Sequence, residues 1–201
     1  MKKVEKQILI ASVLFILLLG AVIGTYFLIK SSQQFKYHDY KVYKGRLEGI
    51  NVNFYIVLIQ TPAGSLAPVY LRSDPRTIEN IPMDVDSSLY GGISKVWLTS
   101  DPEIPSESII AKGQVGTFST TIGLDTDYAL TRDAQNFNEI SCQNATSSVR
   151  VIEVRMANET RIYSEGKCII IQGENEDSMI KAADRFVIVW LERLMTGVRN
   201  A

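Results

Sequence analysis

The hydrophobic pattern is most uneven near the N-terminus, where one long apolar stretch runs from Ile8 to Ile29. This stretch contains no charged side chain. At about 1.5 Å per residue, a helix of roughly 22 residues is about 33 Å long, enough to cross the ~30 Å hydrocarbon core of a bilayer. A helix pairs its own backbone N–H and C=O groups, so it can lie in lipid. The pattern predicts a transmembrane helix over residues 8–29.

A cleaved signal peptide is the alternative interpretation of this stretch. Lys2, Lys3 and Lys6 fit both interpretations. The apolar region of a signal peptide is about 7–15 residues long, and no small-x-small cleavage site follows the stretch here. We therefore expect the helix to remain as an anchor.

The flanking charges predict how the anchor is oriented. Residues 1–7 hold three lysines and one glutamate, whereas Lys30 is followed by uncharged residues. Positive charge favours the cytoplasmic side of a membrane. We expect a cytoplasmic tail over 1–7, a spacer over 30–36 and a domain over 37–201 on the outer face of the cell membrane.

Beyond the spacer, β-branched and aromatic residues gather in short runs that are typical of strands. The first such runs are Tyr40–Tyr43, Asn53–Gln60 and Ala67–Arg72. The last two flank a Pro-Ala-Gly turn at residues 62–64, and they are predicted to pair as a hairpin.

Three more strands are predicted in the C-terminal third. Val149–Met156 is followed by a turn, and Thr160–Tyr163 returns as the second strand. After another turn, Cys168–Gln172 is apolar enough to be a fully buried third strand.

Two helices are also expected. The first, Ser106–Phe118, should stop early because threonines crowd residues 117–121. It lies between the predicted strands Val96–Thr99 and Tyr128–Thr131, which would then run parallel.

The second helix, over about 178–195, is the longest element of the predicted domain. Asp177 is expected to cap it and Gly197 to end it. Asp184 and Arg185 lie away from the apolar face and are expected to be solvated, with a buried ion pair or a site as the alternative. It is more apolar than a surface helix needs, so we expect it to pack deeply over the sheet or to meet a partner. The predicted fold class is therefore α/β (α+β), with a sheet-rich outer domain and a long C-terminal helix.

Composition and charge exclude some classes of protein. The chain has 201 residues, is 46% hydrophobic and has a formal net charge of −1, which is typical of a folded protein. Residues 31–201 hold 17 basic and 21 acidic side chains. No nucleic-acid partner is expected, because such a partner needs a basic face.

The cysteine pair is consistent with an exported domain. Cys142 and Cys168 are predicted to form a disulfide, with two free buried thiols as the alternative. A redox or metal role has little support, because no C-x-x-C occurs and the single histidine, His38, lies close to the anchor. No metal and no cofactor is expected.

Two N-glycosylation sequons lie in the predicted outer domain. They begin at Asn144 and Asn158, and both fall where turns are expected, which suits surface acceptors.

A repeated pattern, V-aromatic-L-x-S-D-P, occurs at 69–75 and again at 96–102. Its aspartates are expected to cap the next element, with proline at the first helical position. The alternative is an acidic rim at the carboxyl edge of a sheet, where α/β proteins bind ligands. The residues of that candidate catalytic site are Asp74, Arg76, Asp101 and Glu103.

No other motif predicts catalysis. A Ser-His-Asp system would have to use His38, beside the membrane. Ser-Lys or paired-carboxylate catalysis stays open, but no spacing selects a pair. Within the anchor, Gly20 and Gly24 lie one turn apart and would let two helices approach closely, giving a homo-oligomer.

Three segments resemble uncharacterised small single-pass membrane proteins of archaea. They are an L-R-S-D-P-R…I-P element over Leu71–Pro82, a C-x-N-A-T element over Cys142–Thr146 with Cys168, and A-A-D-R over Ala182–Arg185. The resemblance covers about a third of the chain. It implies an envelope location and carries over no site.

The sequence favours a membrane-anchored, extracytoplasmic interaction or envelope-organising module that binds a protein or an envelope polymer, with no identifiable catalysis. One alternative is a membrane-tethered hydrolase of envelope material that uses carboxylates. Another is an accessory subunit of a membrane complex. A hydrolase should have carboxylates of raised pKa in a deep pocket, whereas an interaction module should expose an apolar patch or a sheet edge.

Overall fold

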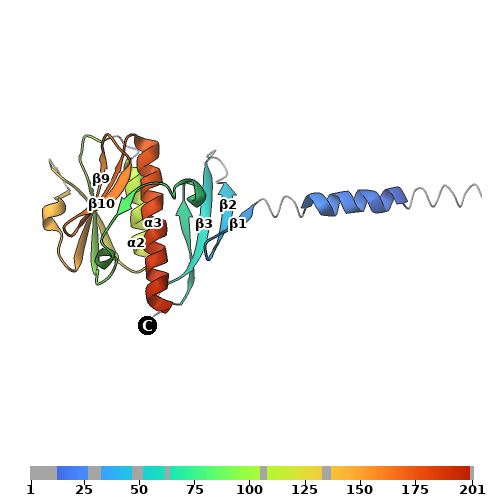
Figure 1. Ribbon diagram of the computed structural model, residues 1–201, viewed down its shortest axis with the longest axis horizontal. Helices are drawn as coiled ribbons and strands as arrows, with labels where there is room; N and C mark the ends of the chain where they lie inside the picture. The colour runs from blue at the N-terminus through green and yellow to red at the C-terminus, as the bar shows by residue number, and fades with distance from the viewer. Residues whose placement is uncertain are drawn as a thin grey trace, which may run out of the picture.

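The computed structural model describes residues 13–26, 33–46, 52–61, 64–104, 108–132 and 137–199. Its fold is mixed α and β, as predicted, with two β-sheets and two helices between them. Figure 1 shows the helix α3 (Glu176–Arg199) standing between a sheet that contains β9 and β10 and a smaller sheet that contains β2 and β3. The layers are thus sheet, helices, sheet.

The smaller sheet is an antiparallel meander. Its strands, in spatial and chain order, are β1 (Gln34–Tyr37), β2 (Tyr40–Arg46), β3 (Asn53–Gln60) and β4 (Leu66–Leu71). The predicted hairpin is confirmed, because β3 and β4 pair antiparallel with Val57 opposite Val69.

The larger sheet has seven strands in the order β5-β10-β11-β9-β6-β7-β8. The strands are β5 (Met83–Asp84), β6 (Lys95–Ser100), β7 (Asp125–Leu130), β8 (Asn138–Glu139), β9 (Val149–Met156), β10 (Arg161–Glu165) and β11 (Cys168–Gly173). β6 and β7 are parallel, as expected, and the helix α2 (Ser108–Thr121) joins them. Short 3-10 turns lie at η1 (Pro75–Thr77), η2 (Ser87–Tyr90) and η3 (Cys142–Asn144).

The order of the last three strands differs from the simple return that the sequence predicts. β10 does not lie beside β9, because β11 inserts between them, parallel to β9 and antiparallel to β10. All six residues of β11 are buried. A strand buried on both faces belongs in the middle of a sheet, with a partner on each side.

Both helices extend beyond their predicted bounds. α2 continues to Thr121, and the hydroxyls of Thr120 and Thr121 donate to carbonyl oxygens one turn back, at 2.8 and 2.7 Å. α3 begins at Glu176, where the Asn175 side chain caps it by accepting from the Ser178 N–H at 3.0 Å. The expected cap, Asp177, lies in the first turn, and the expected end, Gly197, lies inside the helix.

One core joins the three layers. The buried residues of this core come from β2, β3 and β4 on one side and from β6, β9 and β11 on the other, and they meet α2 and α3 in the middle. Phe118 of α2 packs edge-on against Trp190 of α3, with ring centroids 5.5 Å apart. Asp184 of α3 is fully buried, against the expectation of a polar face, because the chain after β4 and Gln114 of α2 pack over it.

Near the N-terminus, residues 13–26 form a helix with exposed apolar side chains, among them Ile16, which is 68% exposed. Residues 8–12 and 27–29 of the expected transmembrane span lie outside the described residues. None of the helices in the described ranges combines the length and the apolar character needed to cross a membrane.

Candidate functional site

Charge is divided unevenly between the two sheets. The described residues of the small sheet and its turns, 33–46, 52–61 and 64–72, hold five basic side chains and one acidic side chain. Residues 73–201 hold 12 basic and 19 acidic side chains. The small sheet is therefore the cationic part of an otherwise acidic domain.

The outer face of the small sheet is apolar. Side chains alternate across a strand, and the inward set, which includes Val42, Val57 and Val69, is buried against the helices. The outward set is Tyr43, Phe54, Ile56, Leu58, Leu66, Pro68 and Tyr70. We call these seven residues the outer face. Leu66 is 73% exposed, Leu58 46% and Tyr70 43%.

The outer face is laterally continuous across three strands. Tyr43, Ile56 and Tyr70 stand opposite one another on β2, β3 and β4. Phe54 meets Tyr70 edge-on, with ring centroids 6.3 Å apart, and the Arg72 guanidinium lies 4.9 Å from the Phe54 centroid. These contacts hold the aromatic rings in place on the surface.

Two lysines extend the outer face toward the β1 edge. Lys36 and Lys41 stand directly opposite each other, and both are exposed. Neither ammonium forms an ion pair within the described residues. Like charges placed directly opposite on neighbouring strands are destabilising, unless an anion lies between or beside them.

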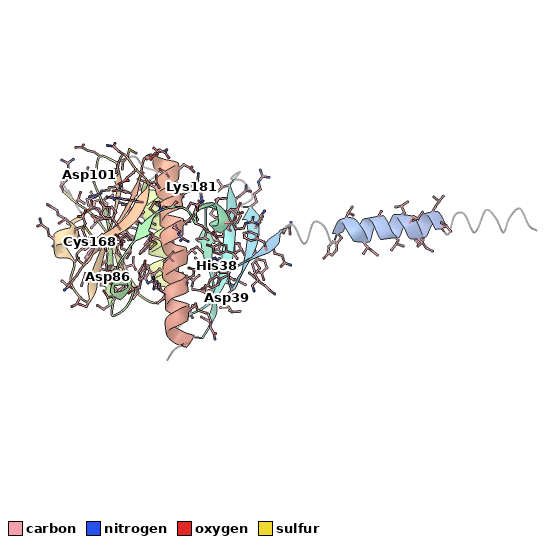
Figure 2. All side chains as sticks on the ribbon, in the orientation of Figure 1. His38, Asp39, Asp86, Asp101, Cys168 and Lys181 are labelled. Carbon is pink, nitrogen blue, oxygen red and sulfur yellow. A yellow bond between two sulfur atoms is a disulfide. The ribbon has the colours of Figure 1, made fainter. Side chains whose placement is uncertain are left out.

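The β1–β2 turn is attached to the helix layer at the end of this sheet. His38 has a positive φ of 49°, its ring stacks on that of Tyr37, and its Nδ1 lies 2.6 Å from Glu192 Oε1 of α3. Figure 2 shows His38 and Asp39 beside α3 on the side of the small sheet, whereas Asp101 and Cys168 lie on the opposite side. The small sheet is therefore fixed to α3 at this corner.

The first pair of candidate catalytic residues forms a local ion pair. Asp74 follows β4 and caps η1, as expected, by accepting from the Arg76 N–H at 3.1 Å. The Arg76 side chain also donates to both carboxylate oxygens, at 2.9 and 2.6 Å, and lies 3.8 Å from the Phe35 ring centroid. These hydrogen bonds keep the pKa of Asp74 below its ordinary value.

The second pair lies on the other sheet. Asp101 follows β6, and it accepts from Arg132 at 3.0 and 3.3 Å. Glu103 shares the same guanidinium at 3.1 Å. The Arg132 hydrogen bonds lower the pKa of Asp101. Since β4 and β6 belong to different sheets, the structure does not bring the four candidates to one sheet edge.

The cysteines lie on the far face of the large sheet. Their sulfurs are 2.09 Å apart, so the predicted disulfide is present. It ties η3 to the start of β11 over a small buried cluster that contains Val151 and Ile170. Within the described ranges, no group of three or more His, Cys, Asp or Glu side chains could hold a metal ion.

The sequon asparagines are both at the surface, in the turns that were expected. Asn144 is exposed in η3 and accepts from the Ser141 N–H at 2.9 Å, and Asn158 is exposed in the bend after β9. In the N-terminal helix, Gly20 and Gly24 have open space where a side chain would stand.

Sequence reasoning missed the outer face. In β3 nearly every residue is apolar, so alternation does not reveal which set points outward. The available signal was the charge contrast between residues 33–72 and residues 73–201, together with Pro68, which marks β4 as an edge strand.

Comparison of the chain with protein-family models, with curated proteins and with solved structures finds no match.

Proposed function

We propose that the chain is a single-pass membrane protein whose outer domain is an envelope-organising module. In this proposal residues 8–29 are the anchor, the domain lies outside the cell, and the outer face of the small sheet rests on the anionic lipid surface. The observation that carries the proposal is the exposed apolar face with its two opposed lysines on an otherwise acidic domain.

The short connection between helix and sheet supports this placement. Tyr26 is the last described residue of the N-terminal helix, and β1 begins at Gln34. Eight residues span at most about 28 Å when fully extended. An anchored helix therefore keeps the small sheet within one domain diameter of the bilayer surface.

The chemistry of the outer face suits a lipid surface. Tyr43 and Tyr70 combine an aromatic ring with a polar hydroxyl, and such side chains are favoured where acyl chains meet headgroups. Lys36 and Lys41 add two cations, each worth about 1 kcal/mol near an anionic surface. The surplus of acidic residues in 73–201 repels the same surface and so favours the proposed orientation.

A hydrolase that uses the predicted carboxylates is less well supported. General acid catalysis near neutral pH needs a carboxyl group of raised pKa. Asp74 and Asp101 are instead held ionised by Arg76 and Arg132.

Fractionation tests the anchor. The full chain should stay with membranes after alkaline carbonate extraction, and protease added to intact cells should remove the domain. Release into the carbonate supernatant, or protection of the domain in intact cells, would overturn the anchored outer location. The same experiment with a glycosidase tests whether Asn144 and Asn158 carry glycans.

A pair of tryptophan variants tests the lipid-facing surface. Leu66→Trp places a reporter on the outer face, and Ile109→Trp places one on α2, where Ile109 is 64% exposed. In nanodiscs of anionic brominated lipid, the added emission of Leu66→Trp should be quenched and that of Ile109→Trp should not. Equal quenching of the two variants, or none, contradicts the proposal.

A further inference from the structure

A buried serine and a buried lysine meet at the carboxyl end of β6. Ser100 is the last residue of β6, and its neighbours β7 and β9 lie on opposite sides of it. The chain leaves β6 through α2 to reach β7, and it comes back to β9 on the other side. This reversal of strand order at the carboxyl edge is where open α/β sheets bind ligands.

The two side chains are hydrogen-bonded. Lys112 Nζ lies 2.6 Å from Ser100 Oγ, with the lysine 8% and the serine 2% exposed. Burial lowers the pKa of Lys112 below the usual value for a lysine. A lysine that loses its proton more readily can act as a base.

The surroundings of Lys112 differ from those of the other paired lysines. Lys95 lies 3.0 Å from Asp125 and 2.5 Å from Asp127, and Lys181 lies 2.5 Å from Asp177. Lys112 has no carboxylate partner among the described residues. A lysine buried only for stability is normally paired with an opposite charge, and this one instead contacts a hydroxyl.

Both side chains line a cavity of about 320 Å³. Three large apolar side chains that also line it are exposed, namely Ile109, Tyr128 and Phe137. The titratable groups on the same wall are Asp101, which Arg132 holds, and Tyr128. A cavity of this size and character suits a short apolar acyl group better than a charged one.

We infer that Ser100 and Lys112 form a nucleophile and base pair that cleaves an ester or amide with an apolar acyl group. Ser100 Oγ attacks the carbonyl carbon while its proton passes to Lys112 Nζ. The bond to the leaving alcohol or amine breaks, and Lys112 returns the proton to that group. Water then attacks the acyl-serine, giving a carboxylic acid and restoring the serine hydroxyl. This pairing of serine with a lysine base is a known variant of nucleophilic catalysis.

The inference is independent of how the domain lies on the membrane. The reacting groups are a serine and a lysine, unlike the carboxylates of the hydrolase that the sequence leaves open as an alternative. Ser100 and Lys112 are twelve residues apart on a strand and a helix, so no sequence motif joins them.

A fluorophosphonate probe tests the pair directly in the full chain in mild detergent. Ser100 Oγ should displace fluoride from the probe phosphorus, and peptide mapping should find the adduct on Ser100. Ser100→Ala should abolish labelling. Ser119→Ala is the matched control, because Ser119 is also buried but donates only to a backbone carbonyl, at 2.8 Å.

Lys112 is tested by Lys112→Met, which should slow labelling of Ser100 by at least ~100-fold, in line with the loss of a general base. Hydrolysis of p-nitrophenyl butyrate should fall by a similar factor.

Thermal unfolding of each variant reports whether the fold survives the substitution. If Lys112→Met does not fold, the labelling rate of the unmodified chain is measured against pH instead. This rate should rise with pH, and the midpoint of the rise should lie below the pKa of an ordinary lysine. Absence of an adduct on Ser100, a folded Lys112→Met that labels normally, or a rate that does not change with pH overturns the inference.

Discussion

Asp184 Oδ2 accepts a hydrogen bond from the Ser73 backbone N–H at 2.7 Å, which joins α3 to the chain that leaves β4. The same oxygen accepts from the Arg72 N–H at 2.9 Å, and Oδ1 accepts from Gln114 Nε2 at 2.8 Å. Gln114 also donates to the Tyr70 carbonyl at 3.1 Å. One buried carboxylate therefore connects α3, α2 and the small sheet, and it holds the outer face in position.

Removal of this carboxylate should destabilise the domain. Asp184→Ala leaves the partly buried donors of Arg72, Ser73 and Gln114 without this acceptor, and each unsatisfied group costs about 1–3 kcal/mol. We expect a loss of about 3 kcal/mol or more in the free energy of unfolding, measured by urea denaturation. The matched control on the same helix is Asp177→Ala, which breaks an exposed pair with Lys181 and should cost under about 1 kcal/mol. Equal effects of the two variants would contradict the structural role of Asp184.

The stability of the domain should also depend on pH through Asp184. Burial raises its pKa from 3.8 to about 6, so the folded state favours the protonated form. Asp184 contributes fully to stability at pH values below its pKa in the unfolded chain. This contribution is lost as pH rises from about 4 through about 6. The loss corresponds to about 3 kcal/mol.

Asp184→Asn serves as the reference for this measurement, because an amide does not titrate. Both chains are unfolded at a series of pH values from about 4 to about 7.5. As pH rises, the free energy of unfolding of the unmodified chain should fall relative to that of Asp184→Asn. Parallel pH profiles would rule out a raised pKa for Asp184.

Two glycines of α2 should respond in opposite directions to alanine. A Cβ at Gly116 would collide with the Tyr128 hydroxyl and stand 2.9 Å from Leu98 Cδ1, so Gly116→Ala should cost about 1–3 kcal/mol. Gly113 has open space, so Gly113→Ala should stabilise the helix by up to about 1 kcal/mol. Thermal unfolding of the two variants shows whether each substitution raises or lowers stability. A loss of stability in Gly113→Ala as large as that in Gly116→Ala would mean that helix packing is not the cause.

The elements were largely predictable from local pattern, whereas their neighbours in space were not. The hairpin of β3 and β4 and the parallel pair of β6 and β7 follow from strand runs and turn residues. The insertion of β11 between β9 and β10 depends on burial on both faces, which is a property of the assembled sheet. For the same reason the helical pattern places Asp184 on the polar face of α3, whereas in the fold its carboxylate is buried against residues 72–73 and Gln114 of α2.

The disulfide should stabilise the domain by restricting its unfolded chain. It closes a sequence separation of 26 residues, which corresponds to about 3.5 kcal/mol on the chain-entropy model. A Cys142→Ala, Cys168→Ala double variant should lose about this much in urea unfolding, and added reductant should then have no further effect. If reductant leaves the unmodified chain as stable as before, the bond does not contribute to the fold.

Some of the candidate sites could be predicted from a sequence motif, and others could not. Asp74 and Asp101 were found from a repeated motif, yet the motif repeats because both aspartates accept backbone N–H groups at the end of a strand. The outer face and the Ser100–Lys112 pair have no motif. Each is produced by the fold, the first by strand pairing across β2, β3 and β4, the second by packing of α2 against β6.

The most direct measurement of the proposed membrane contact is the reactivity of Lys36 and Lys41 toward an acetylating reagent. The full chain is placed in nanodiscs of anionic or of neutral lipid, and acetylation is followed residue by residue with mass spectrometry, with Lys181 as the internal reference. The proposal predicts that both lysines are protected in anionic discs, that salt reduces this protection, and that Lys181 reacts equally in both. If Lys36 and Lys41 react at the same rate in anionic and neutral discs, the small sheet does not lie on the lipid surface.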